Sequence, residues 1–226
     1  MEKQSVIKVS GAAMLKVAPD YNSIKIEVER NFPTNDEAYE AAKQNSLAVI
    51  AALKSVGLDG SLAKTARFDI TERKEPVYKN GHIVGYDKVE YLLYQTFVIE
   101  LPTDNMRINE ICVAITESMP DAEIKLHSFL SNPHAYKMEV LSIAVMDARE
   151  KAEVIATTLG CTLGEILEIE YRDGDTNMRK IFYCPSINDE PNFIIRTQSK
   201  TPLSMTGEDQ TISDSVMVTW QLENPR

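Results

Sequence analysis

The fold is decided by residues 5–57, which read SVIKVSGAAMLKVAPDYNSIKIEVERNFPTNDEAYEAAKQNSLAVIAALKSVG. Two strand patterns, at about 5–16 and 22–32, meet at a Pro19-Asp20 turn, and an alanine-rich helix follows at about 35–57. In the second strand, apolar and charged residues alternate: Ile24, Ile26 and Val28 with Lys25, Glu27 and Glu29. This alternation predicts a sheet with one face on a core and its charged face toward water.

Both ends of the predicted helix carry recognisable signals. Asn35 is suited to cap the helix, and Asp36 and Glu37 suit the positive end of its dipole. Gly57 is a suitable stop. We therefore expect a helix whose alanine stripe lies on the sheet.

Two long strand patterns, at about 62–78 and 83–101, flank Asn80-Gly81. Asn-Gly is the strongest short-range hairpin signal, because both turn positions take a positive φ. Further along the chain, the patterns predict helices at about 104–119 and 134–159, the first opened by Thr103 or Asp104, and strands at about 122–130, 165–172 and 212–222. Residues 173–209 are poorly patterned, with two short apolar runs at 181–184 and 193–195 that we interpret as short strands.

From residue 22, the order β-α-β-β-α-β is that of a ferredoxin-like unit. We expect an α+β fold: a two-layer sandwich of mostly antiparallel sheets, with two long helices and one shorter helix. Residues 1–226 are predicted to form a single region with two subdomains. The first is the ferredoxin-like unit at 22–130, and the second is an α+β unit built from 1–21 together with 131–226.

The composition argues against several classes of binding partner and indicates the redox state of the cellular compartment. The net charge of −10 opposes binding to nucleic acid and to an anionic membrane surface. The three cysteines, Cys112, Cys161 and Cys184, are odd in number and form no CxxC pair, which favours a reducing compartment. The N-terminus does not resemble a signal peptide, and no run is long enough to span a membrane. We expect a cytoplasmic protein, with the periplasm or envelope as the alternative if an export signal has been removed.

In the order and spacing of its segments, the chain resembles the SIMPL-domain family, whose bacterial members include oxidative-stress-defence proteins. The matching segments are VSGAAMLKVAPDYNSIKIEVE, the helix around Ala38–Gly57, Gly85-Tyr86, AVMDAREKAEVIATTLGCTLGEILEIE and TPLSMTGEDQTISDSVMVTWQL. The resemblance implies an α+β fold, export in many members, oligomer formation and no established enzymatic activity. The family has no catalytic motif, so no functional residue carries over.

The histidines, cysteines and acidic residues form no recognisable catalytic or metal-binding motif in this sequence. His82, His127 and His134 lack the spacing of a zinc site. Cys112 faces the core side of its helix, and Cys184 is the one plausible reactive thiol. The acidic runs around Asp69 and Glu165 are expected to be solvated. We predict no catalytic residue, no metal and no cofactor.

The hairpin offers the clearest functional hypothesis. Its arms of about 15 residues exceed what a compact domain needs, and open strand edges recruit other strands, although Pro76 and its charged neighbours also suit a blunted edge. We expect a non-enzymatic binding or assembly protein that forms homo-oligomers and has a stress-related role. Two alternatives stay open: a small-molecule binder or hydrolase with a site between the hairpin tyrosines and residues 173–209, and an adaptor for another protein. The candidate interaction surface is Tyr78, Tyr86, Tyr91 and Tyr94.

Overall fold

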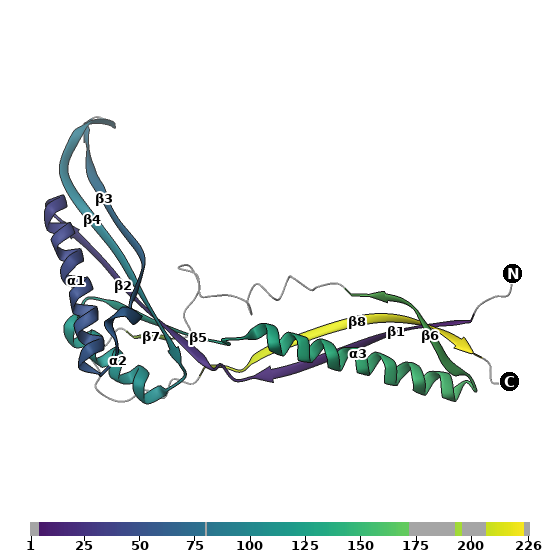
Figure 1. Ribbon diagram of the computed structural model, residues 1–226. Helices are drawn as coiled ribbons and strands as arrows, with labels where there is room; N and C mark the ends of the chain where they lie inside the picture. Colours follow the sequence, from purple (N-terminus) through teal and green to yellow (C-terminus); the bar gives the residue numbers. More distant parts are fainter. Residues whose placement is uncertain (1–4, 80, 172–192, 196–206, 224–226) are drawn as a thin grey trace. The chain divides into compact units, whose positions relative to one another are not determined.

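The computed structural model describes residues 5–79, 81–171, 193–195 and 207–223 (Figure 1). It confirms the α+β fold, with three helices and two antiparallel sheets. In chain order the elements are β1 (Val6–Val17), β2 (Tyr21–Phe32), α1 (Asn35–Ser55), a 3₁₀ turn (Gly60–Leu62), β3 (Lys64–Lys79), β4 (His82–Pro102), α2 (Asn105–Ser118), β5 (Glu123–Phe129), α3 (Pro133–Thr158), β6 (Thr162–Glu170), β7 (Phe193–Ile195) and β8 (Gln210–Glu223).

The described elements form two compact units. The ferredoxin-like unit contains β2–β5, β7, α1 and α2, and the long-helix unit contains β1, α3, β6 and β8. The two adjacent strands of the opening stretch, β1 and β2, therefore belong to different sheets. Of the two short strands expected late in the chain, β7 is present, whereas 181–184 lies outside the described residues.

In the ferredoxin-like unit the strand order is β3-β4-β2-β5-β7, and every pair is antiparallel. The first four strands thus have the order expected for a β-α-β-β-α-β unit. The apolar residues of β2 and β4 pack with α1 and α2 into one core. That core includes Ile24, Ile26, Leu53, Phe97 and Ile111.

Side chains at the helix starts satisfy backbone groups that have no partner within the helix. Thr34 is the N-cap of α1, because its side-chain oxygen accepts from the Glu37 N–H at 3.3 Å. The predicted cap, Asn35, was wrong by one position, since Asn35 is already the first helical residue. Asp104 caps α2, as one of the two expected residues, and Gly57 follows α1 with φ 77°.

The hairpin of β3 and β4 continues beyond the rest of the sheet. β2 ends where Phe32 stands opposite Tyr91, whereas β3 and β4 remain paired from Arg73–Glu90 to Lys79–His82. Figure 1 shows this part extending past β2 and α1. Gly81 turns the chain with φ 80°. We call Arg73–Lys79 together with His82–Glu90 the hairpin extension.

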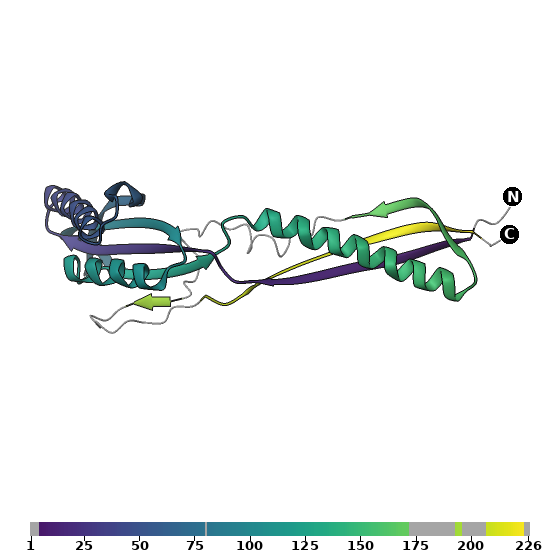
Figure 2. The ribbon, with the colours of Figure 1, turned by 60° about the horizontal axis from the view of Figure 1, so that its bottom comes forward.

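The long-helix unit is a three-stranded antiparallel sheet in the order β1-β8-β6. α3 runs along β1 and β8 (Figures 1 and 2). α3 has a stripe of small side chains at every fourth position, and it is buried at Ala144, Ala148, Ala152 and Ala156. Gly11 of β1 meets the helix directly: a Cβ built there would lie 2.0 Å from the Ala144 carbonyl oxygen. Glycine at position 11 therefore allows this helix–sheet contact.

Candidate functional site

The four hairpin tyrosines occupy different surroundings. Tyr91 packs partly buried beside Ala38, Ala42 and Leu93 on the helix-covered face. Tyr94 lies an odd number of residues further along β4, on the other face, where the Arg67 guanidinium lies 4.2 Å from its ring centroid. Tyr86 is exposed on the hairpin extension, and the side chain of Tyr78 lies outside what the structure describes.

The helix-free face of the same sheet holds a buried charge cluster. The Glu27 carboxylate of β2 lies 2.7 Å from the Lys25 ammonium and 2.5 Å from the Lys125 ammonium of β5. Lys25 is 4% exposed and Glu27 is 9% exposed. The expectation that these two residues face water was wrong, because β2 is an inner strand of the sheet and its charges pair across the ladder. Glu29, further along the strand, is exposed as predicted.

The electrostatics of the cluster keep its carboxylate ionised. Burial pushes the pKa of Glu27 upward, but the hydrogen bonds from Lys125 and Lys25 outweigh it and hold the pKa below its ordinary value of 4.5. Burial acts against the charge of Lys125, yet the Glu27 hydrogen bond raises the Lys125 pKa. A general acid or base near neutral pH needs the opposite arrangement. The cluster is therefore a structural ion-pair network.

We predict that this network makes the free energy of unfolding depend on pH in the acidic range. Because the folded-state pKa of Glu27 is depressed, its stabilising effect is present above about pH 4.5 and is lost as the pH falls through the folded value. The free energy of unfolding of the wild type should therefore approach that of Glu27→Gln as the pH falls from about 7 to about 3. Urea denaturation of both proteins across this range measures the gap, and a gap independent of pH would contradict the assignment.

The described cysteines and histidines differ in their burial. Cys112 is buried, and burial raises the pKa of its thiol to about 12, so it stays protonated as a core residue, as expected. His127 lies within β5 opposite Ser23, and His82 and His134 are exposed. No group of three histidine, cysteine or acidic residues within the described ranges could hold a metal ion. Cys184 lies outside those ranges.

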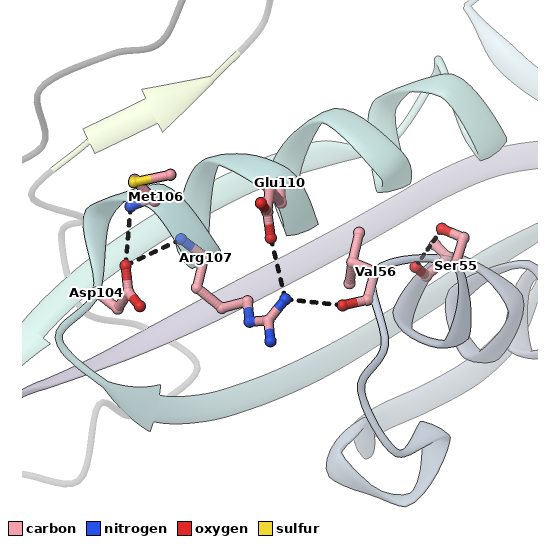
Figure 3. Close-up of polar contacts among 7 residues, drawn as sticks. Ser55, Val56, Asp104, Met106, Arg107 and Glu110 are labelled. Carbon is pink, nitrogen blue, oxygen red and sulfur yellow. Dashed lines mark hydrogen bonds and ion pairs between the residues drawn. The ribbon is translucent and has the colours of Figure 1, made fainter.

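A shallow hollow of about 450 Å³ lies between the end of α1 and the outer side of α2. The Arg107 guanidinium donates to the Val56 carbonyl oxygen at 2.8 Å and to the Glu110 carboxylate at 3.0 Å (Figure 3). The Asp104 carboxylate accepts from the backbone N–H groups of Met106 and Arg107 in the same view. Of these contacts, the hydrogen bond from Arg107 to Val56 ties α2 to the end of α1 beside the hollow.

A second depression, of about 480 Å³, lies in the long-helix unit between α3 and β6. We call it the α3–β6 groove. Ile166 and Ile169 of β6 stand opposite Trp220 and Val218 of β8 and so share their face of the sheet. They nevertheless remain 56% and 59% exposed, because α3 lies over β1 and β8. The remaining lining residues are Val145, Arg149, Glu153, Leu163, Gly164 and Glu165.

Sequence reasoning missed both the charge cluster and the groove. A weak signal existed for each: Lys25 sits between buried isoleucines, and Ile166 and Ile169 belong to a strand facing a helix of small side chains. The acidic residues predicted to be solvated, Asp69 and Glu165, are exposed. The alternative small-molecule site depends on residues 173–209, most of which lie outside the described ranges, and it stays a prediction.

Comparison with known proteins gives two kinds of match. The model of the SIMPL family, described as a protein of unknown function, matches residues 7–220. The "26 kDa periplasmic immunogenic protein" of Brucella abortus (strain S19) is 27% identical over 172 residues, as is the protein of the same name from Brucella melitensis biotype 1. The match covers 72% of this chain and 65% of each relative. No helix within the described residues is long and apolar enough to cross a membrane. The family match spans most of the sequence, and the chain therefore belongs to the SIMPL family.

Proposed function

We propose that this chain is a non-enzymatic binding and assembly protein that forms homo-oligomers through its hairpin extension. The supporting observation is apolar surface on a part of the hairpin that lies beyond the end of β2. Ile83 is 52% exposed, Val84 58% and Tyr86 59%. Unpaired strands and clustered apolar side chains are the features that bring a second chain into contact. Tyr78, Tyr91 and Tyr94 remain part of the proposed interaction surface.

The chemistry of the described residues favours assembly over catalysis. The buried ionisable groups that meet in the sheet, Lys25, Glu27 and Lys125, are held in ion pairs with one another. Exposed apolar side chains instead gather on the hairpin extension and in the α3–β6 groove. A scaffold with such surfaces is suited to contact with other chains.

We place this function in the periplasm, because the names of both relatives give that compartment. The stress-related role that the family resemblance implies is part of the same proposal. Osmotic-shock fractionation of the source cells, probed with an antibody, measures the location. Recovery of the protein with cytoplasmic markers would contradict the placement.

Survival of cells lacking the protein under hydrogen peroxide measures the stress role, and survival equal to that of the parent strain would contradict it.

Charged substitutions on the hairpin extension should abolish self-association. In the double variant Ile83→Lys/Tyr86→Lys, lysine replaces two exposed apolar side chains, so the fold is expected to persist while the contact is lost. Central apolar contacts often contribute about 2 kcal/mol or more, so the dissociation constant should rise at least roughly 30-fold. Light scattering after size exclusion measures the mass at matched concentrations.

The matched control is Leu47→Lys, which places a lysine at an equally exposed apolar position on α1. We expect this variant to keep the wild-type mass. Circular dichroism checks that all three proteins remain folded. A hairpin variant that keeps the wild-type mass would exclude the extension as the contact.

A further inference from the structure

The long-helix unit has one covered sheet edge and one edge beside the groove. On β1, the Ala12 N–H donates to the Asp147 carboxylate of α3 at 2.8 Å, and the Lys151 ammonium lies 3.4 Å from the Ser10 carbonyl oxygen. Side chains of α3 thus occupy backbone groups that a further strand would need. β6 pairs with β8 alone among the described strands. A second chain that contacts this sheet therefore meets β6 and the α3–β6 groove.

The groove is lined mainly by apolar side chains; its charged lining residues are Arg149, Glu153 and Glu165, of which Arg149 pairs with Glu153 at 2.8 Å. Ile166, Ile169 and Trp220 provide most of the floor, and its walls are completed by Val145 and Leu163. β6 carries three acidic residues and no basic one. Lys8 of β1 forms an ion pair with the last of them, Glu170. An apolar ligand that also carries positive charge fits this combination.

The hairpin extension has the complementary composition. The extension as a whole carries four basic and three acidic residues, and its β3 arm, Arg73–Lys79, holds three of the basic residues and one of the acidic residues. Its β4 arm offers the exposed side chains Ile83, Val84 and Tyr86. Lys74 pairs with Glu72 at 3.1 Å, but both side chains are 45% exposed, and such surface pairs are readily exchanged.

We propose that the α3–β6 groove of one copy of this chain binds the hairpin extension of a second copy. The inference rests on the proposed function and names the surface that receives the extension. Apolar side chains of the extension fill the groove, and its basic arm lies along the acidic residues of β6. The contact depends on side chains, because Pro76 of β3 and the register shifts between β3 and β4, which skip Asp87 and Val84 of β4, interrupt regular backbone pairing along the extension.

This contact joins two different surfaces, so it is heterologous. The heterologous arrangement has a specific consequence. A chain with a damaged extension keeps an intact groove, and a chain with a damaged groove keeps an intact extension. Two such chains can still form one contact with each other.

A mixing experiment tests this consequence. The extension variant is Ile83→Lys/Tyr86→Lys, the groove variant is Ile166→Lys/Ile169→Lys, and all four positions are exposed. The control is Leu159→Lys, at an exposed position on the residue that follows α3. Light scattering is measured for each protein alone and for an equimolar mixture of the two double variants. Circular dichroism and thermal unfolding verify that each variant is folded.

We expect each double variant alone to have the mass of one chain, the mixture to contain a species of two chains, and Leu159→Lys to keep the wild-type mass. The chain has a single tryptophan, Trp220, and it lines the groove. Its emission should therefore shift when the mixture forms. The shift should saturate with added groove variant, because its intact extension enters the intact groove of the extension variant.

Four results would overturn the inference, two of them directly and two through the proposed function. A folded groove variant that keeps the wild-type mass would show assembly without the groove, and it would leave assembly through the extension intact. A mixture that stays at the mass of one chain would exclude the heterologous contact. A wild type that is itself monomeric, or an extension variant that keeps the wild-type mass, would instead contradict the proposed function on which the inference rests.

Discussion

Gly11→Ala should destabilise the protein more than a glycine-to-alanine substitution at any other described glycine, and the loss should fall on the long-helix unit. The new Cβ would lie 2.0 Å from the Ala144 carbonyl oxygen and 2.5 Å from the Ala148 backbone nitrogen. Both atoms belong to the helix backbone, which cannot turn aside as a flexible side chain can. α3 would have to lift from β1, and the alanine stripe would lose its packing. We expect a loss of about 3 kcal/mol in the free energy of unfolding.

The matched control for this prediction is Gly85→Ala. Nothing lies within 4 Å of a Cβ built on Gly85, and this residue is not among the glycines with positive φ. We expect this substitution to change stability by about 0.5 kcal/mol or less. Urea denaturation followed by circular dichroism measures both variants. Equal stabilities of Gly11→Ala and Gly85→Ala would contradict the close approach of α3 to β1.

Glu27→Gln should cause the second large loss in the free energy of unfolding. The substitution keeps the size of the side chain but removes the negative charge that faces Lys25 and Lys125. The side chain of Lys25 is only 5% exposed, so its ammonium group would lose, inside the protein, the negative charge that Glu27 provides at 2.7 Å. Breaking a buried ion pair from one side costs about 3 kcal/mol. We expect a loss of that order at pH 7.

An exposed ion pair provides the comparison for this variant. Glu40 pairs with Lys43 at 2.5 Å on α1, where both side chains are more than half exposed. Glu40→Gln should therefore cost about 0.5 kcal/mol or less. Replacing the whole cluster by apolar residues, as in Lys25→Met/Glu27→Leu/Lys125→Met, should recover part of the lost stability. If Glu27→Gln and Glu40→Gln cost the same, the cluster is not buried as described.

Local patterns in the sequence predicted most of the ferredoxin-like unit. Alternation in β2 and the Asn80-Gly81 turn are short-range signals, and they correctly indicated a β-α-β-β-α-β order. The partner of β1 was not predictable in the same way. Val6 pairs with Gln221 and Val17 with Gln210, so the contact closes a loop of almost the whole chain. No local pattern distinguishes this strand from β2, which joins the other sheet.

The candidate sites were harder to predict than the fold, because each depends on contacts between distant elements. Lys25 and Glu27 look like the water-facing half of an alternating strand, and their burial becomes visible only when Lys125 is placed beside them. Similarly, the four-residue spacing of the alanines of α3 favours close packing, but it fits a sheet or another helix equally well. The burial of Ile166 and Ile169 depends on which strands α3 covers. The spacing of residues in the sequence does not contain that information.

The central claim is that this member of the SIMPL family works by binding further copies of itself. The most direct test is the mass of the wild-type protein, measured by light scattering after size exclusion at micromolar concentration. One chain has a mass of 25.4 kDa. We expect a mass that is a multiple of this value and that falls toward it on dilution. A mass of one chain at every micromolar concentration would contradict the claim.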